Sequence, residues 1–312
     1  MTRPLVTVVI ETITARYDGG ETTGSLANDL AGAIAALGRQ TWPQDRIEVI
    51  VVLDDAIDAA TDEELRTRYR DVRFVQARES NYFVAKNTGA AAARGDIIAL
   101  LDGDSVPEPD WLEVMLARFV DGIDVVVGRT RYRGQSFAAR TFSIPDFAYV
   151  LDKEGGDASG FNINNVAFRT SVLRSHPFDE RIRRNGGCYL LYHQLRAAGA
   201  RIVYEPRGRV SHGVDVRGLG FVRKHFDRGY DSMAVYRLDD QSVLRGTRWI
   251  RRSGGLAIVP IIARRIVVDW LRLAKHRRQI GISIPALPWY GTVAVAMRLI
   301  ELAGALKAIV VR

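Results

Sequence analysis

The sequence contains little cysteine and shows no leader-like start. Cys188 is the one cysteine among 312 residues, which excludes an intramolecular disulfide and a metal site built from several cysteines. A lone cysteine is compatible with a reducing compartment. Residues 5–10 already have the pattern of a strand, so we expect no signal peptide and a chain whose bulk stays in the cytosol. The length and a hydrophobic content of 47% suffice for one large domain or two small ones.

Long apolar runs are also lacking. Residues 279–297 carry no charge, and 19 residues approach the length of a membrane span. Prolines and glycines interrupt this stretch, and charged residues follow it at Arg298, Glu301 and Lys307. We therefore expect an interfacial or re-entrant hairpin here rather than a clean transmembrane helix.

Acidic residues are scarce in the last third. Residues 201–312 hold 21 Lys and Arg but 8 Asp and Glu, a balance of +13, whereas residues 1–200 have a balance of −5. This asymmetry indicates an anionic membrane surface or a nucleic acid as a partner of the C-terminal third. A basic face that is merely solvated is the alternative, and no nucleic-acid-reading motif accompanies the charge.

The same third contains an amphipathic helical pattern. One arc of the helical wheel is apolar and the opposite side carries Arg264, Arg265, Arg272 and Lys275. Such a stripe, faced by arginines, is typical of a helix that lies in a membrane interface. An amphipathic helix packed on its own domain would show the same pattern. The apolar arc consists of Val259, Ile262, Ile266, Trp270 and Leu273.

The first 130 residues alternate between strand and helix signals. Strands are predicted at residues 5–10, 47–53, 73–77, 97–101 and 125–128, with helices at 26–37 and 84–94. Repeated βα units with short connections predict an α/β fold, with a mostly parallel sheet and flanking helices. Further along we expect short strands at 164–168 and 202–205, the second followed by Pro206 and a turn to His212, and a helix at 189–198.

Carboxylates follow two of the predicted strands. Asp54 ends one of them, and Asp102-Gly103-Asp104 follows the wholly apolar run at 97–101. Because the carboxyl ends of parallel strands share one edge of a sheet, these groups should converge on one crevice. Two carboxylates around a glycine suit a hard divalent cation that also holds phosphates. A helix cap and a solvated loop are the simpler alternative.

Several motifs, in order, resemble family 2 glycosyltransferases of the GT-A fold. The resemblance covers residues 5–230, and its most specific part is residues 95–104, preceded by Lys86-Asn-Thr-Gly89 and followed by residues 109–112. The opening strand at 6–10 and the segments at 40–43 and 48–55 also match. Later matches fall at 164–169, 178–180, 195–199 and 210–212. The resemblance implies a Rossmann-like nucleotide-sugar site, in which Glu11 and Asp54 contact the nucleoside and Lys86 lies near the nucleotide. A solvated helix lysine is the alternative for Lys86.

The same resemblance implies a metal-dependent reaction. Asp102 and Asp104 would hold Mg²⁺ or Mn²⁺ on the diphosphate, with Asp102 also contacting the nucleotide. His212 would add a ligand, as a histidine near this point does in some GT-A enzymes, although a structural hydrogen-bonding histidine is the alternative. The metal would stabilise the leaving diphosphate, while a carboxylate base removes the acceptor's proton and the anomeric centre inverts.

The sequence departs from the family pattern at the expected base. Counting back from residues 195–199, the family's Glu-Asp pair falls on Gly187-Cys188. Cys188 is a weak substitute, and a buried structural thiol is the simpler interpretation. Asp179 and Glu180 lie eight or nine residues earlier and are the candidates for a catalytic carboxylate, although Phe-Asp-Glu is often structural at the entry to a helix.

These features together predict an inverting glycosyltransferase. The Gln-x-x-Arg-Trp motif of processive synthases is missing, and residues 221–230 resemble polysaccharide- and glycolipid-assembling members. We therefore expect single or limited transfer from a UDP- or GDP-sugar to a lipid-linked or polysaccharide acceptor, at the cytoplasmic face of the cell membrane. Residues 1–235 would form the GT-A domain, with a nucleotide-binding half (1–130) and an acceptor half (131–235). Residues 236–312 would form membrane-associated helices.

A non-catalytic member of the family is the alternative function. Such a protein would keep the fold and bind a nucleotide or a partner without turnover, and the missing Glu-Asp pair favours it. Nucleic acid is not expected as a partner, because only the charge of the last third suggests it.

Overall fold

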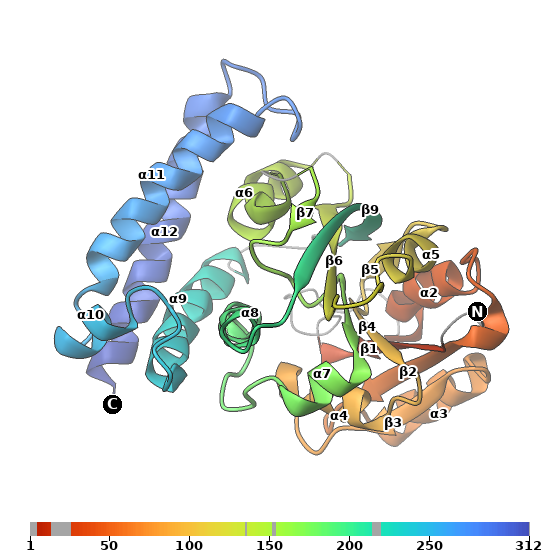
Figure 1. The fold of residues 1–312 in the computed structure, drawn as a ribbon. Helices are drawn as coiled ribbons and strands as arrows, with labels where there is room; N and C mark the ends of the chain where they lie inside the picture. The colour runs from red at the N-terminus through yellow and green to blue at the C-terminus, as the bar shows by residue number, and fades with distance from the viewer. Residues whose placement is uncertain (1–4, 14–25, 135, 152–153, 214–219, 312) are drawn as a thin grey trace.

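The computed structural model describes residues 5–13, 26–134, 136–151, 154–213 and 220–311. The expected absence of a leader concerns residues 1–4, which lie outside these ranges. A nine-stranded sheet with the order β3-β2-β1-β4-β8-β6-β9-β5 forms the centre, and β7 pairs with β9 (Figure 1). The strands are β1 (Val6–Glu11), β2 (Ile47–Leu53), β3 (Arg73–Gln76), β4 (Ile97–Asp102), β5 (Ser105–Pro107), β6 (Val125–Tyr132), β7 (Gly156–Asp157), β8 (Val166–Arg169) and β9 (Ile202–His212).

Helices cover both faces of this sheet and form a separate layer at the C-terminal end (Figure 1). The short turn η1 (Gln44–Arg46) leads into β2. The helices are α2 (Leu26–Leu37), α3 (Ala59–Arg68), α4 (Tyr82–Ala92), α5 (Trp111–Leu116), α6 (Phe137–Leu151), α7 (Thr170–Ser175), α8 (Gly187–Ala197), α9 (Gly220–Leu238), α10 (Thr247–Arg252), α11 (Ile258–His276) and α12 (Leu287–Val310).

The N-terminal half is the predicted parallel βα arrangement. β1 pairs in parallel with β2 and β4, and β2 with β3. Successive side chains of a strand point to opposite faces, so Val9 and Leu100 pack with α4 in one core while Val8 and Leu101 pack with α2 in the other. Because β1 and β4 are buried along their whole length, their uninterrupted apolar sequences suit a sheet that is covered on both faces.

The sheet as a whole is mixed, which corrects the prediction of a mostly parallel one. β8 runs antiparallel to both β4 and β6, and β5 and β7 run antiparallel to β9. β9 is also longer than predicted, because it continues through Pro206 to His212. Its pairing with β6 shifts register between Val127 and Arg129, and this irregularity accommodates the proline that cannot donate a ladder hydrogen bond.

Most of the apolar arc of α11 packs against the rest of the chain, although Val259 at its start is exposed. Ile262 and Leu273 are buried, and Trp270 lies against Gly291 of α12. The pattern therefore reflects a helix packed on its own chain, the second of the two interpretations offered by the sequence. Among the helices in the described ranges, none is long and apolar enough to cross a membrane.

Candidate metal centre

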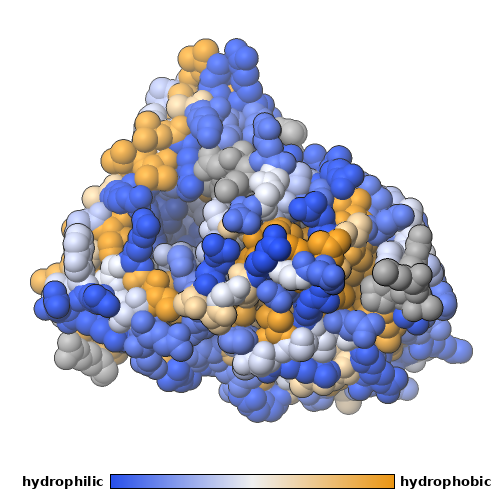
Figure 2. All heavy atoms as spheres, viewed as in Figure 1, coloured by the Kyte–Doolittle hydropathy of each residue, from blue (hydrophilic) through white to orange (hydrophobic). Residues whose placement is uncertain are grey.

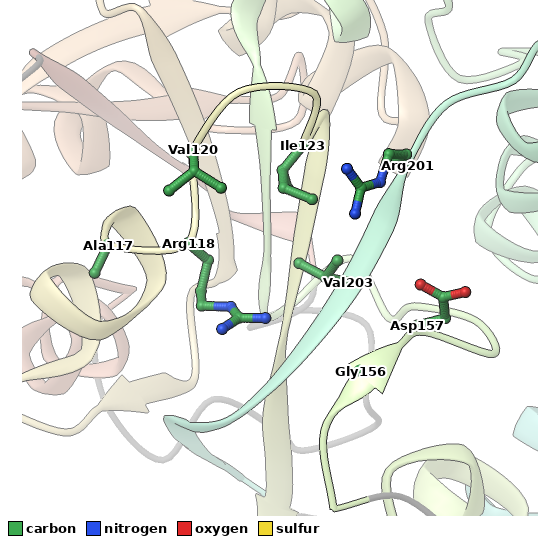
Figure 3. Close-up of a pocket in the computed structure, with 8 residues that line it drawn as sticks. All are labelled: Ala117, Arg118, Val120, Ile123, Gly156, Asp157, Arg201 and Val203. Carbon is green, nitrogen blue, oxygen red and sulfur yellow. The ribbon is translucent and has the colours of Figure 1, made fainter.

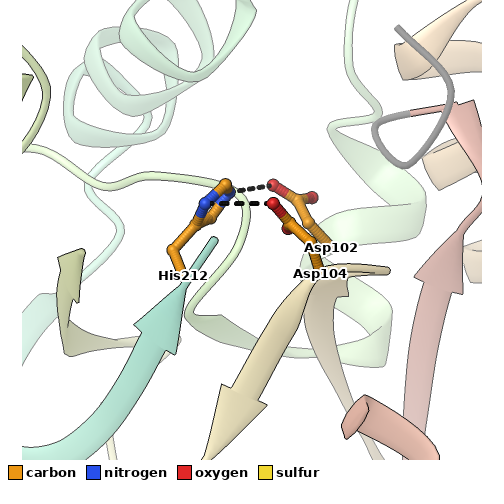
Figure 4. Close-up of side chains that lie close together, drawn as sticks. All are labelled: Asp102, Asp104 and His212. Carbon is orange, nitrogen blue, oxygen red and sulfur yellow. Dashed lines mark hydrogen bonds and ion pairs between the residues drawn. The ribbon is translucent and has the colours of Figure 1, made fainter. Parts of the chain in front are cut away.

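The three predicted metal ligands meet where β5 pairs with β9. Asp102 ends β4, Asp104 follows within two residues, and Ser105 begins β5. β5 is antiparallel to the end of β9, with Ser105 opposite His212. This pairing carries the two carboxylates to the imidazole at the carboxyl edge of the sheet (Figure 4). Residues more than a hundred positions apart in the sequence therefore share one site.

The cluster has the geometry of a small cation site. His212 Nε2 lies 3.4 Å from Asp102 Oδ2, and His212 Nδ1 lies 3.3 Å from Asp104 Oδ2. One ligand atom from each residue falls within 4.8 Å of the others. Asp102 and His212 are buried, whereas Asp104 is partly open. Two carboxylate oxygens and one imidazole nitrogen form a donor set that fits Mn²⁺ or Mg²⁺, with coordination positions left over for a diphosphate.

Asp102 is held as a carboxylate by groups on α4. Its Oδ1 accepts hydrogen bonds from Tyr82 Oη at 2.7 Å and from Lys86 Nζ at 3.0 Å. Burial acts to raise the pKa of Asp102, but Lys86 and His212 outweigh it and hold the pKa well below its usual range. Because Oδ1 is occupied by α4, Oδ2 is the oxygen that faces His212. The carboxylate is therefore both charged and oriented.

His212 is held in an environment that favours positive charge. Burial acts to lower its pKa, but the carboxylates of Asp104 and Asp102 raise the pKa of the imidazole to about 9. The two carboxylates attract a proton to this position by the same field that would attract a metal cation. Beside the imidazole, Tyr132 makes an edge-to-face contact at 5.8 Å between ring centroids.

Tyr132 is fixed in turn by a buried ion pair. Its hydroxyl donates to Asp146 of α6, and the same carboxylate is paired with Arg228 of α9. Burial acts to raise the pKa of Asp146, but Arg228 more than offsets this and lowers it. The chain of contacts from His212 to Arg228 therefore connects the candidate metal centre with the C-terminal helical layer.

The carboxylates expected to contact a nucleoside end the neighbouring strands. Glu11 ends β1 and lies in register with Asp102 on β4. Asp54 follows β2 and is fully buried, and it accepts hydrogen bonds from Thr12 Oγ1 and Ser80 Oγ, both at 3.0 Å. The predicted convergence of strand-end acids on one edge is thus seen in the structure, and their role toward a nucleoside stays a prediction.

Lys86 differs from the alternative of a solvated helix lysine. Its side chain is fully buried, and besides Asp102 it donates to the carbonyl oxygen of Leu101. A buried ammonium group is stable only where it is paired. Lys86 is therefore a buried part of the site, and its charge directly stabilises the ionised form of Asp102.

The two candidate catalytic carboxylates are engaged elsewhere. Asp179 accepts two hydrogen bonds from the guanidinium of Arg181, and Glu180 is paired with Arg78 and accepts from Asn87. Hydrogen bonds from Arg181 lower the pKa of Asp179. Glu180 also has a lowered pKa, because Arg78 and Asn87 outweigh the effect of burial. Their predicted role as base stays a prediction.

Cys188 lies near the cluster as a neutral thiol. Burial raises its pKa to about 12, and the charges of Asp102 and Lys86 both act on it. A thiol with such a pKa is protonated at neutral pH and is a poor proton acceptor. The structure therefore favours the structural interpretation of Cys188.

A pocket lies at the other end of the same strands. It is formed around the amino ends of β6 and β9, opposite the ends that carry Tyr132 and His212 (Figure 3). Its residues include Arg118, Asp157 and Arg201. None of the predicted site residues contributes to its lining, so it is separate from the candidate metal centre.

Two site residues found in the structure were missed in the sequence. Tyr82 precedes Lys86 by four positions, so both side chains lie on one face of α4. That spacing could have predicted Tyr82 as a site residue once α4 was placed beside β4. Tyr132 gave no comparable signal, because its contact with His212 depends on how far β6 and β9 run side by side.

Comparison with solved structures identifies the fold class. A mannosyltransferase from Pyrobaculum calidifontis, PcManGT, solved with GDP-mannose and Mn²⁺, superposes with a TM-score of 0.61 over 99% of this chain and 88% of that one, at 17% identity. GalNAc-T7, solved with UDP, GalNAc and Mn²⁺, gives a TM-score of 0.53 over 69% of this chain and 44% of that one, at 13% identity. The fold is therefore of the GT-A type.

Sequence comparison gives the family. The family model described as glycosyl transferase family 2 matches residues 23–182, about half of the chain, and the chain belongs to this family of transferases. The putative glycosyltransferase EpsH of Bacillus subtilis (strain 168) is 31% identical over 46% of this chain and 44% of its own length. The succinoglycan biosynthesis protein ExoM of Rhizobium meliloti (strain 1021) is 28% identical over 60% of this chain and 63% of its own length. The matches thus span less than two thirds of these relatives.

Proposed function

We propose that this protein is an inverting glycosyltransferase that transfers a sugar from a UDP- or GDP-sugar in the presence of Mn²⁺ or Mg²⁺. The observation that carries the proposal is the meeting of Asp102, Asp104 and His212 at the carboxyl edge of the sheet, beside the buried acids Glu11 and Asp54. Membership of the family supports it, as do the structures of PcManGT with GDP-mannose and Mn²⁺ and of GalNAc-T7 with UDP, GalNAc and Mn²⁺.

The residues present fit a metal-bound diphosphate. Asp102, Asp104 and His212 would hold the cation, which when bound would neutralise charge on the leaving diphosphate. Lys86 and Tyr82 keep Asp102 ionised and aimed at that position. Glu11 and Asp54 would accept from N–H and O–H groups of the nucleoside, since their oxygens lie at the same sheet edge.

The proposed acceptor is a lipid-linked saccharide or a growing polysaccharide at the cytoplasmic face of the membrane. Apolar surface on the side of the molecule where α11 and α12 lie supports this (Figure 2). It includes Val267, Leu271, Trp289 and Leu299, which are 54–66% exposed. They lie in the strongly basic third of the chain, and a basic surface with exposed Trp and Leu suits an anionic lipid interface. In this proposal residues 1–235 form the catalytic domain and residues 236–312 the membrane-facing helices.

A donor screen tests the proposal. The purified full chain is incubated with Mn²⁺ or Mg²⁺, a panel of UDP- and GDP-sugars, and bacterial membranes or their lipid extract, and release of nucleoside diphosphate is measured. We expect cation-dependent release with at least one donor, stimulated by the extract. Calorimetric binding of a nucleotide without release from any donor would favour the non-catalytic alternative, which the Gly187-Cys188 departure suggests.

A further inference from the structure

The start of α8 lies beside the candidate metal centre and carries no carboxylate. Gly187 packs directly on the ring of Phe83, whose neighbour Tyr82 donates to Asp102. The next residue, Cys188, experiences the charge of Asp102. An acceptor hydroxyl that attacks from this side needs a proton acceptor, and the residues of α8 nearest the centre do not supply one.

Helix α9 brings a carboxylate to the segment that leads into α8. Arg228, Asp231 and Val235 follow one another at helical spacing, so they lie on one side of α9. Arg228 reaches α6 through its ion pair, and Val235 packs against Gly186 at the start of α8. Asp231 lies between these two contacts, and therefore on the side of α9 that faces α6 and the start of α8.

Asp231 is anchored to the segment that precedes α8. Its Oδ2 accepts a hydrogen bond from the backbone N–H of Asn185 at 3.1 Å and another from the Asn185 side-chain amide at 2.8 Å. Oδ1 takes part in neither bond. The carboxylate is thus fixed through Oδ2.

The charge environment of Asp231 differs from that of the other candidates. Burial raises the pKa of Asp231, and the charge of Asp227 adds to this effect; together they outweigh the hydrogen bonds from Asn185 and the charge of Arg183, which act to lower the pKa. By contrast, hydrogen bonds from arginines lower the pKa of Asp179 and contribute to lowering that of Glu180. A general base is more effective when its pKa lies closer to the working pH, and it must not be neutralised by a fixed guanidinium partner. Geometry and environment therefore both favour Asp231.

We propose that Asp231 is the catalytic base of this glycosyltransferase, an assignment that rests on the proposed function. One carboxylate oxygen takes the proton of the acceptor hydroxyl as the hydroxyl oxygen bonds to the anomeric carbon. The bond from that carbon to the donor phosphate breaks, and its electron pair leaves with the nucleoside diphosphate. The carboxyl group then releases its proton to water, which returns the enzyme to its starting state.

The test compares Asp231→Asn with Asp227→Asn. The two residues lie one turn apart on α9, but Asp227 is half-exposed and faces Arg223 at 3.7 Å. Asn at 231 keeps an oxygen that accepts from Asn185, so the fold is maintained, which thermal unfolding verifies. We expect Asp231→Asn to lower kcat for transfer at least 100-fold, with nucleoside diphosphate affinity in Mn²⁺ unchanged. Asp227→Asn should stay within about threefold of the wild type.

Two further readouts separate chemistry from structure. The wild type should lose kcat/KM at acid pH as Asp231 is protonated, and Asp231→Asn should lack that acidic limb. Adding Cys188→Asp to Asp231→Asn should raise kcat for transfer at least tenfold above that of Asp231→Asn alone. The assignment is overturned if Asp231→Asn transfers sugar like the wild type, or if Glu180→Gln or Asp179→Asn alone abolishes the acidic limb. If the wild type turns over no donor, the proposed function falls and this assignment falls with it.

Discussion

At the scale of single residues, the site is organised around one buried ion pair. Lys86 and Asp102 are 3.0 Å apart, and both side chains are almost completely buried. Taking two charges out of water is costly, and the cost is repaid only by close pairing and further hydrogen bonds. Tyr82 and the carbonyl of Leu101 provide those bonds. The arrangement fixes the position of a carboxylate that the proposed metal requires.

Replacing the cation of this pair should destabilise the protein strongly. Lys86→Met removes the buried lysine partner of Asp102 and leaves the carboxylate to Tyr82 and His212, so we expect the free energy of unfolding in urea to fall by about 3 kcal/mol. Arg66→Met is the matched control, because Arg66 pairs with Asp62 on the surface of α3. That change should cost about 0.5 kcal/mol or less. Equal effects of the two substitutions would contradict the structural role given to Lys86.

Several site residues could be predicted from the sequence, but most of their contacts could not. Asp54, Asp102 and Asp104 were predictable because strand ends of a parallel sheet share an edge, and His212 because its segment resembles the family. The burial of Lys86 was not predictable, since it depends on how α4 is rotated against β4. Asp231 was not singled out, because its contact with Asn185 joins segments 46 positions apart.

At the scale of elements, α9 and α12 approach each other unusually closely. A Cβ at Gly229 of α9 would lie 1.8 Å from the carbonyl oxygen of Glu301, and one at Gly304 of α12 would lie 2.0 Å from that of Phe226. Only glycine permits such backbone contact. The close crossing buries His225 of α9 against Glu301, whose partner is Arg298.

The crossing yields a prediction with an internal control. Gly229→Ala should force the two helices apart and lower the free energy of unfolding by about 3 kcal/mol or more, because overpacking of a tight contact combines with strain on the buried charges. Gly220→Ala adds the same methyl group to the same helix, at a position where no atom of the described residues lies within 4 Å, and it should change stability by less than about 1 kcal/mol. Chemical denaturation of both variants provides the comparison. A harmless Gly229→Ala would show that α9 and α12 do not cross as described.

Element identity followed from the sequence more reliably than element pairing. β2 and α2 were predicted with their observed bounds, because apolar spacing and the stop at Gly38 define them. The antiparallel insertion of β8 was missed, since a short apolar strand gives no sign of its direction. The apolar arc of α11 predicted a helix correctly, and part of the arc packs on α12, since a helical pattern identifies an apolar face without identifying what covers it.

At the scale of the whole molecule, charge and exposed apolar surface coincide. The last third carries a balance of +13 against −5 for the rest, and the α11–α12 pair stands at one side of the molecule, away from the sheet (Figure 1). Through Arg228 and Asp146 this layer connects to Tyr132 beside His212. The surface proposed to face the acceptor is thereby connected by contacts to the candidate metal centre.

Membrane attachment through this surface is testable with vesicles. The protein should cosediment with vesicles rich in phosphatidylglycerol, bind phosphatidylcholine vesicles weakly, and release as salt is raised. Val267→Glu with Leu271→Glu should weaken binding at least tenfold. Val120→Glu is the control, since Val120 is equally exposed but lies after α5. Binding that depends neither on lipid charge nor on the Val267→Glu and Leu271→Glu substitutions would exclude this surface as the attachment site.

Calorimetric binding of GDP and UDP, with and without Mn²⁺, tests whether the Asp102–Asp104–His212 cluster holds a metal-bound diphosphate. We expect at least one diphosphate to bind the wild type with an affinity at least tenfold higher in Mn²⁺, and Asp104→Ala to abolish this gain. Asp110→Ala, at an exposed carboxylate before α5, should leave the gain intact. Nucleotide binding that is indifferent to Mn²⁺, or a gain that survives Asp104→Ala, would contradict the assignment of the Asp102–Asp104–His212 cluster.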